Sequence, residues 1–422
     1  MTESALEDRS RRVQRFVVFA YGCEPDKGSE PGAGWIWSRM IARIGETWVI
    51  TRENNRPSIE RHLPSVPERE NLRFVYVDLP PRARFWKRGR RGARLYYVLW
   101  QAAALARARE LEREISFDAA WHLTWANAWI GSMAALLRKP FVFGPVGGGV
   151  SPPWRLAPTL GIRGVVYEIA RAFARAGARY ANPLARISWR KAHLILVQNP
   201  ETRAWLPRRY REKAILFPNA FIEHAPPLRN RSVARPPYTA FFAGRLIPLK
   251  GLALALRTLA LLPDWRLVIS GDGPDENRLK RLAMRWGVGD KVDFVGWLPR
   301  SGVSSWMLRA DVFLFPSLHD EGPFAVAEAM AHGLPVVCLD RGGPPVLGGN
   351  AVTPKSAART AAALADAMSR SVGTEVGPYP PMSSRADDLV RVLDAAFPTW
   401  QLSAEEPSEL PSPVTDQANG AR

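Results

Sequence analysis

Residues 317–340 have the sequence SLHDEGPFAVAEAMAHGLPVVCLD, which contains a loop, a helical run and a strand in that order. Asp320 and Glu321 precede a small apolar run that carries a third carboxylate, Glu328. Gly333 interrupts this run, and the β-rich segment VVCL follows it. Because glycine is typical of the position just after a helix, we expect the helix to end at Gly333. The stretch therefore predicts a loop, helix and strand unit with acids on the loop and on the helix.

The same alternation extends through most of the chain in two sets. In the first set, the β-rich runs are residues 15–20, 47–51, 73–78, 118–122, 141–144 and 194–198, with helical patterns at 34–45 and 93–114. In the second set, they are 239–244, 266–270, 292–296, 312–316 and 336–339, with helical patterns at 251–262, 276–287, 303–310 and 324–332. Strands separated by helices indicate parallel sheets. We therefore predict an α/β protein with two Rossmann-like, doubly wound domains that face a central cleft.

The boundary between the two sets falls in residues 217–239, which are rich in proline and arginine and lack periodicity. We predict a first domain over residues 1–222 and a second over 223–383. Residues 384–400 form a further predicted helix, which we expect to pack back on the first domain. The polar segment 401–422 is expected to be a disordered tail.

The chain is strongly basic, with 58 Lys and Arg against 40 Asp and Glu and a net charge of +18. Such a surplus favours nucleic acid, anionic lipid or phosphorylated small molecules as partners. It is densest in residues 82–94, which include Phe85, Trp86, Lys87, Arg88, Arg90 and Arg91. Three interpretations of this basic surplus stay open: contact with an anionic membrane surface, a solvated face without a partner, or contact with nucleic acid or substrate, which we rank below the other two.

The sequence has no long apolar run and no signal-peptide pattern, so we expect a cytoplasmic protein. Peripheral association with the inner face of the cell membrane is a second expectation. Cys23 and Cys338 are the only cysteines, and we expect both to be reduced and without a metal.

Two glycine-rich loops follow predicted strands of the first domain. The first loop includes Gly28, Ser29, Glu30 and Gly32 and leads into a helix, whose N-terminus suits an anion. The second contains the consecutive glycines Gly147, Gly148 and Gly149. His122 ends another predicted strand, and we expect it to face the cleft. Each loop also has a simpler interpretation as a turn that needs glycine.

The second domain has a short loop between Gly244 and a predicted helix, and this loop contains Arg245 and Lys250. Two cations at a helix start can neutralise a diphosphate. Gly271 and Gly273 predict a tight turn beneath a ligand. The segment VGWLPR, which contains Trp297, follows another strand, and a backbone group there can meet a flat base edge.

These motifs, in the order AGRL-x3-KG, SGDGP, FVGWLP and PSLHDEGPFAVAEAMAHGLPVV, resemble the nucleotide-sugar-binding domain of the retaining glycosyltransferases of family 4. The resemblance spans about residues 238–350 and implies the GT-B fold. The N-terminal segments YGCEPDKGSEPGAGW, ITRENNR and GPVGGG resemble the bacterial branch that builds surface polysaccharides.

The family has a pair of glutamates separated by seven residues. Glu328 matches the second, and counting back places the first on Asp320, whereas Glu321 fits by side-chain length and by the glycine that follows it. Both assignments stay open. The resemblance implies that this acid helps to place the donor sugar. The position of Glu328 in the first turns of its helix suits a carboxylate that accepts both ribose hydroxyls.

The resemblance implies retaining transfer of a sugar from a nucleoside diphosphate sugar to an acceptor hydroxyl. The acceptor would be a saccharide or a polyprenyl-linked saccharide, bound by the two glycine loops of the first domain. The expected catalytic residues are Arg245, Lys250, Asp320, Glu321 and His122. The expected donor-binding residues are Glu328, Gly244, Gly271, Gly273, Trp297, Gly322, Pro323 and Phe324.

No cofactor and no essential metal are expected, since no DxD-type site is evident. Three alternatives remain at this point: a nucleotide-sugar 2-epimerase of the same fold, a weak or inactive enzyme, and a basic nucleic-acid-binding protein. We rank the last low and expect no nucleic-acid partner, because no known nucleic-acid motif occurs.

Overall fold

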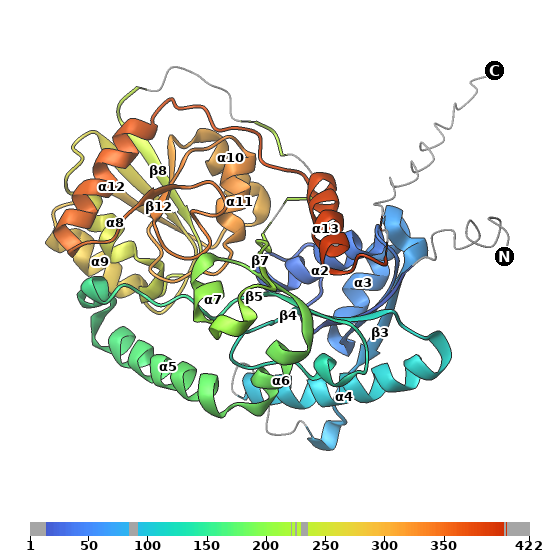
Figure 1. Cartoon of the computed structure of the whole chain (residues 1–422). Helices are drawn as coiled ribbons and strands as arrows, with labels where there is room; N and C mark the ends of the chain where they lie inside the picture. The colour runs from blue at the N-terminus through green and yellow to red at the C-terminus, as the bar shows by residue number, and fades with distance from the viewer. Residues whose placement is uncertain are drawn as a thin grey trace, which may run out of the picture.

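The structure is a computed structural model that describes residues 14–83, 92–220, 222–223, 226–228, 235–400 and 402. It contains two parallel sheets, each covered by helices (Figure 1). The basic segment 85–91 and residues 403–422 of the expected tail lie outside the described residues, so those two expectations stay predictions.

The first sheet has seven strands in the order β3-β2-β1-β4-β5-β6-β7, and all neighbouring pairs are parallel. Their bounds are β1 Arg15–Ala20, β2 Glu46–Arg52, β3 Leu72–Val77, β4 Ala119–Thr124, β5 Phe141–Val146, β6 Ala192–Val197 and β7 Ala214–Leu216. The central strands β4 and β5 are buried at every position, as expected for a sheet with helices on both faces. The sequence predicted six of these strands and missed β7, which has three residues.

The helices around the first sheet are α2 Ser29–Ala42, α3 Arg56–His62, α4 Ala93–Ile115, α5 Gly161–Ala181, α6 Pro183–Lys191 and α7 Pro200–Trp205. Sequence analysis predicted α2 and α4 but not α5 or α6. Helix α2 begins at Ser29, five residues before the predicted helical run, so Glu30 and Gly32 lie on its first turns rather than on a loop.

The second sheet has six parallel strands in the order β10-β9-β8-β11-β12-β13. Its strands are β8 Tyr238–Ala243, β9 Trp265–Ser270, β10 Val292–Gly296, β11 Val312–Phe315, β12 Val336–Leu339 and β13 Asn350–Val352. Its helices are α8 Leu252–Leu259, α9 Glu276–Arg285, α10 Arg300–Arg309, α11 Phe324–Ala331 and α12 Ala357–Ser371. Gly333 follows α11 with φ 72°, which confirms the predicted helix end. The sequence missed β13 and α12.

Helix α13, Met382–Ala396, returns to the first sheet after the second sheet is complete (Figure 1). It contacts α2 and β6. Leu389 and Leu393 are buried in the same apolar cluster as Phe16 and Trp37 of the first sheet's core. The predicted helix at 384–400 is thus present and packs on the side of the molecule where we expected it.

Both sheets reverse their strand order once, between β1 and β4 in the first and between β8 and β11 in the second. In open α/β sheets, ligands bind outside the carboxyl ends of the strands at this point of reversal. The loops that follow these four strands contain residues 21–28, 125–131, 244–251 and 316–323. The topology alone therefore points to these loops as the walls of a site. None of the described helices combines the length and apolarity required to cross a bilayer.

Candidate active site

A cavity of about 480 Å³ lies between the two sheets, at the points of strand reversal. Ser29, Glu30, Gly147 and Gly148 line it from the first domain. The second domain contributes residues from the loops after β8 and β11, namely Lys250, Asp320, Glu321, Gly322 and Phe324. The structure thus brings together nine of the predicted site residues from four separate segments of the chain, which are loops and the first turns of helices. We call this space the central cavity.

The Lys250 ammonium forms an ion pair with Asp320 across the two loops of the second domain. Lys250 also lies 5.0 Å from the centre of the Phe315 ring. The next residue, Gly251, has φ 71°, and a Cβ there would lie 1.9 Å from the Pro316 carbonyl oxygen. Only glycine therefore allows the two loops to approach closely enough for this pair. The result is a fixed positive charge at the cavity wall that an anionic ligand can share.

Glu321 has a different environment from its neighbour Asp320, because its carboxylate bonds to the first domain. It accepts hydrogen bonds from the Gly148 amide at 2.7 Å, from Asn199 Nδ2 at 2.7 Å and from Thr202 Oγ1 at 3.1 Å. Burial raises the pKa of Glu321, but hydrogen bonds from His319, Asn199 and Gly148 outweigh it and lower the pKa to about 2. Glu321 is thus ionised and bridges the two domains, whereas Asp320 faces the cation in the cavity.

The bridge explains why three glycines occur in a row at residues 147–149. A Cβ on Gly147 would lie 2.9 Å from Glu321 Cγ, and one on Gly149 would lie 2.1 Å from Thr202 Cα. Gly148 has φ 102°, a conformation that favours glycine. A larger residue at position 147 would therefore push Glu321 of the second domain away, whereas one at position 149 would disturb the packing of the loop on α7, Pro200–Trp205, of the first domain.

Two polar atoms in the cavity wall lack a hydrogen-bond partner among the described residues. These are Trp129 Nε1 and Asn219 Oδ1, both buried. Because buried polar groups are nearly always satisfied, a donor and an acceptor left open in one cavity suit a ligand with hydroxyl groups. Sequence analysis had no signal for either residue, since neither lies in a motif.

A second cavity of about 860 Å³ adjoins the second domain, and we call it the outer cavity. It is lined by Trp297, which is 72% exposed, and by Glu328, which pairs with Arg300 at 3.1 Å. Gly28 and Lys27 line it from the first domain. A flat aromatic face, a carboxylate and two cations around one space match the parts of a nucleotide.

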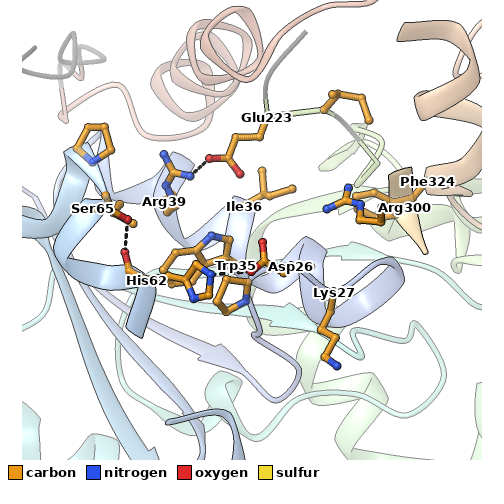
Figure 2. A pocket seen from close by; sticks show the side chains of 15 residues that line it. Asp26, Lys27, Trp35, Ile36, Arg39, His62, Ser65, Glu223, Arg300 and Phe324 are labelled. Atoms are coloured by element: carbon orange, nitrogen blue, oxygen red, sulfur yellow. Dashed lines mark hydrogen bonds and ion pairs between the residues drawn. The ribbon is translucent and has the colours of Figure 1, made fainter. Parts of the chain in front are cut away.

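A third cavity, of about 520 Å³, continues from the outer cavity and is shown in Figure 2. The two share Asp26, Lys27, Ile222 and Arg300. On its far side, Arg39 pairs with Glu223 and with Glu68, the latter at 2.9 Å. The third cavity also shares Phe324 with the central cavity, so it adjoins both of the others, and we refer to the three together as the cleft.

The carboxyl group of Glu30 has a pKa well above that of an ordinary glutamate. Burial raises its pKa to about 7, and a hydrogen bond from the Trp125 main chain offsets this only in part. A carboxyl group that titrates near neutral pH can exchange a proton with a bound substrate. The sequence placed Glu30 near an anion site but did not identify this property, which depends on its tertiary surroundings.

The expectation that His122 faces the cleft is wrong. His122 lies inside β4 and has no exposed surface. Its Nε2 lies 2.7 Å from the Tyr97 hydroxyl and its Nδ1 lies 2.7 Å from Ser132 Oγ. Burial lowers the pKa of His122 to about 3, so the ring is neutral. The strand continues to Thr124, two residues beyond the predicted end, so His122 lies within the strand and its side chain is buried in the core.

Several predicted residues lie beside the cleft rather than in its walls. Arg245 is exposed and lines none of the three cavities. Gly244, Gly271 and Gly273 are partly buried and also line none of them. These glycines pack loops together: a Cβ on Gly271 would lie 1.9 Å from the Gly244 oxygen. Pro323 is the buried N-cap of α11. The tight turn at 271–273 is present, but it supports the loop after β8 instead of touching the cavities.

In the first glycine loop, the structural requirement differs from the one we expected. Gly28 has φ −80°, which any residue can adopt. Gly32 is required because a Cβ there would lie 1.9 Å from the Lys27 carbonyl oxygen. Glycine at position 32 therefore serves the close packing of α2 against its own preceding loop.

Comparisons with known proteins find similarity mainly in the second domain. The family model described as "Glycosyl transferases group 1" matches residues 228–373. The putative teichuronic acid biosynthesis glycosyltransferase TuaC of Bacillus subtilis is 33% identical over 163 residues, which is 37% of this chain and 38% of the relative. The 2-deoxystreptamine glucosyltransferase of Streptomyces kanamyceticus is 33% identical over 106 residues, covering 24% of this chain and 27% of the relative. The matched segments thus span well under half the length of these curated relatives.

Solved structures match along nearly the whole chain, although at low identity. The Anabaena protein HepE in complex with UDP and glucose has a TM-score of 0.56 at 15% identity and covers 90% of this chain and 100% of that one. The sucrose-phosphate synthase of Thermosynechococcus elongatus has a TM-score of 0.57 at 15% identity, with 92% and 100% coverage. Two parallel-sheet domains around a cleft are the architecture of GT-B enzymes. The chain therefore has the GT-B fold. Residues 228–373 of its second domain, which include Lys250, Asp320 and Glu328, match the model of the group 1 glycosyltransferases.

Proposed function

We propose that the protein is a retaining glycosyltransferase that moves a sugar from a nucleoside diphosphate sugar to an acceptor hydroxyl in the synthesis of a bacterial surface polysaccharide. One observation carries the proposal. Lys250, Asp320 and Glu328 all lie in the segment that matches the family, and all line the cleft at the carboxyl ends of the strands. The family match and the position of the cleft thus point to the same three residues.

The donor nucleotide would occupy the outer cavity. Glu328 would accept the ribose hydroxyls in place of Arg300, its present partner at 3.1 Å. Arg300 has a side chain that is 63% exposed, so it can move aside at little cost. The base would lie toward Trp297. The HepE structures with UDP and with UDP-glucose support a nucleoside diphosphate sugar as the donor.

The diphosphate would lie toward Lys250, with Arg245 as a second cation from the exposed side of the same loop. As the bond between the anomeric carbon and the diphosphate oxygen breaks, negative charge grows on the diphosphate. A fixed cation stabilises that charge more in the transition state than in the bound donor. The acceptor oxygen bonds to the anomeric carbon on the face that the diphosphate leaves, and its proton passes to the leaving phosphate. Asp320 would hold the donor sugar beside Lys250.

The acceptor would enter from the first domain, next to Glu30, Gly147 and Gly148. Trp129 Nε1 and Asn219 Oδ1 would bond to its hydroxyl groups. The relatives named for teichuronic acid and lipopolysaccharide core synthesis support a saccharide acceptor, which we propose to be lipid-linked. A lipid-linked acceptor requires peripheral contact with the inner face of the membrane, for which the basic segment 82–94 remains a proposed contact.

We also propose that transfer needs no essential metal, since Lys250 and Arg245 supply the positive charge. Among the described residues, no group of three or more His, Cys, Asp or Glu side chains is placed to hold a metal ion. Turnover that is unchanged by EDTA would support this part of the proposal, and loss that Mg²⁺ or Mn²⁺ restores would overturn it.

The test is a transfer assay with the purified protein, a panel of nucleoside diphosphate sugars and membrane extract as the source of acceptor. We expect one donor to lose its sugar only when extract is present, and NMR of the product to show the donor's anomeric configuration. Lys250→Ala should lower the rate of transfer by about a hundredfold or more, whereas the control Lys280→Ala, in an exposed ion pair of α9, should leave it unchanged. Conversion of a nucleotide sugar without extract would instead identify a 2-epimerase.

A further inference from the structure

Helix α5, Gly161–Ala181, has its apolar residues on the outside. Of the fourteen large apolar side chains that are exposed in the described part of the chain, six belong to this helix. They are Ile162, Val166, Tyr167, Ile169, Phe173 and Tyr180, and Ile162 is 85% and Phe173 75% exposed. Exposed apolar residues scattered singly are normal, but six on one helix form a patch that requires a partner.

Three charged residues in the middle of α5, namely Glu168, Arg171 and Arg175, face inward, which is the reverse of an ordinary surface helix. Glu168 is 2% exposed and Arg175 is 7% exposed. Arg175 donates to the Gly149 carbonyl at 2.8 Å, and Arg171 donates to the Val150 carbonyl at 2.6 Å while pairing with Glu168 at 3.1 Å. These bonds fix the rotation of the helix, so it cannot turn its apolar face inward without leaving buried charges unpaired.

None of the residues that the structure describes covers the exposed apolar side chains of α5. Figure 1 shows α5 along the edge of the molecule, with the two domains on one side of it only. A helix of 21 residues extends about 32 Å, at about 1.5 Å per residue. The patch therefore forms a long apolar strip rather than a single hot spot.

The surroundings of the strip are basic. Residues 151–193 contain eight Arg and Lys but one acid, Glu168, which is buried. Arg155 and Arg163 are exposed near the start of α5, and Arg186, Arg190 and Lys191 are exposed on α6 directly after it. The strip thus has exposed cations at both ends and no exposed acid within this segment.

We propose that α5 docks the protein on an anionic lipid bilayer, with its apolar face inserted at the level between headgroups and acyl chains. Apolar side chains on one face with flanking Arg and Lys are the pattern of helices that lie in the plane of a membrane interface. The aromatic residues Trp154, Tyr167 and Tyr180 suit the headgroup level. The cations at both ends pair with anionic lipid headgroups.

A second copy of the chain fits this surface less well. Each chain carries a net charge of +18, and pairing two α5 helices would bring their basic ends together. An anionic lipid surface instead supplies the opposite charge at both ends and an apolar interior beneath the strip. Charge complementarity therefore selects the bilayer as the occupant.

Docking through α5 would also place the cleft relative to the bilayer. The inner face of the helix holds residues 149 and 150, next to the Gly148 amide that binds Glu321. The helix and the acceptor side of the central cavity thus form one unit. The inference that this arrangement serves a lipid-linked acceptor rests on the proposed function. The inference that α5 docks on a bilayer does not depend on it.

The test is co-sedimentation of the full chain with vesicles of phosphatidylcholine alone and of phosphatidylcholine with phosphatidylglycerol. We expect binding to the anionic vesicles only. The double variant Val166→Gln/Phe173→Gln should weaken this binding by about tenfold or more, since it removes two buried apolar contacts. Met284→Gln is the matched control, because Met284 is equally exposed on α9, at 75%. Binding that the double variant leaves unchanged would overturn the proposal.

Two further readouts separate docking from the other possibilities. The variant Phe173→Trp should show more quenching of tryptophan fluorescence by brominated acyl chains than the wild type, which has 16 Trp, whereas a helix that stays above the headgroups would show no added quenching. Sedimentation velocity without lipid should give a monomer, and a dimer that Val166→Gln/Phe173→Gln dissociates would assign the strip to a second copy. Nucleotide binding by the double variant should equal that of the wild type, so that failure of docking and failure of the proposed function can be told apart.

Discussion

The two domains use charge in different ways. In the second domain, the pairs Lys250–Asp320 and Arg300–Glu328 line cavities, and their side chains are between 15% and 63% exposed. In the first domain, the pairs Arg39–Glu68 and Arg171–Glu168 are enclosed, with side chains between 3% and 10% exposed. The comparison shows that the second domain has charges a ligand can share, whereas the first uses charges to fix its shape.

The physical difference lies in what replaces a lost partner. At a cavity wall, water or a ligand can solvate the remaining charge, so an ion pair there contributes about 0–1 kcal/mol to stability. In an enclosed pair, removal of one partner leaves an uncompensated charge, which costs about 3–5 kcal/mol. Substitutions in the two domains should therefore separate loss of folding from loss of function.

The largest effect is expected for Glu68→Ala in the first domain. It leaves Arg39 with Glu223 as its remaining acidic partner. We expect the free energy of unfolding, measured by urea denaturation, to fall by about 3 kcal/mol. Glu328→Ala, the matched change in the second domain, should lower it by less than about 1 kcal/mol. An equal fall in the free energy of unfolding of both variants would show that the ion pairs of the two domains do not differ in this way.

Lys250→Ala should produce the largest loss of activity. Removing a charge that stabilises the leaving diphosphate lowers kcat by about a hundredfold or more. Because Lys250 lies at a cavity wall, the melting temperature should change little. Steady-state kinetics and a thermal melt of the same preparation measure both quantities. A large fall in melting temperature with normal kcat would mean that Lys250 is structural.

Glu328→Gln should act on nucleotide affinity. The amide keeps the size of the side chain but loses the charge that strengthens its hydrogen bonds to ribose hydroxyls. We expect the Kd for the nucleotide to rise by about tenfold, as measured by calorimetry. An unchanged Kd would place the ribose elsewhere in the cleft.

Two acids of the cleft should give opposite pH dependences of stability. The pKa of Glu321 is lowered to about 2, so the bridge to the first domain stabilises the fold above about pH 4.5 and loses this effect as pH falls toward 2. The pKa of Glu30 is raised to about 7, so the folded state binds the extra proton, and stability falls as pH rises from about 4.5 to 7.

Unfolding of Glu30→Gln and Glu321→Gln across this pH range tests both signs. Glu30→Gln should be more stable than the wild type at pH 8 and equal to it at pH 4. Glu321→Gln should be less stable at pH 7, and the deficit should shrink in acid. A Glu30 variant with the same stability profile as the wild type would show that its carboxyl group titrates normally.

Sequence alone predicted the second domain well because its signals are local. Its strands are continuous apolar runs, and Gly333 and Gly251 fall where the backbone needs φ above zero. The cleft followed from strand order, and so nine predicted residues from four segments of the chain meet in the central cavity.

The features that sequence missed depend on tertiary contacts. No local pattern distinguishes Asp320, which faces Lys250, from Glu321, which bonds to Gly148 and Asn199 of the other domain. His122 appeared to end a strand but is enclosed by Tyr97 and Ser132. Helix α5 escaped prediction because its charged residues face inward toward a loop, and only the structure shows that loop.

The central claim is that a nucleoside diphosphate binds the second domain through Glu328 and Lys250. Its most direct test is calorimetric titration of UDP, GDP and ADP into the wild type, Glu328→Ala and Lys250→Ala, with Glu276→Ala on α9 as the control. The account predicts that one nucleotide binds the wild type and the control, and that both site variants weaken this binding by about tenfold or more. Binding of equal strength in all four proteins, or no binding to the wild type at millimolar nucleotide, would contradict it.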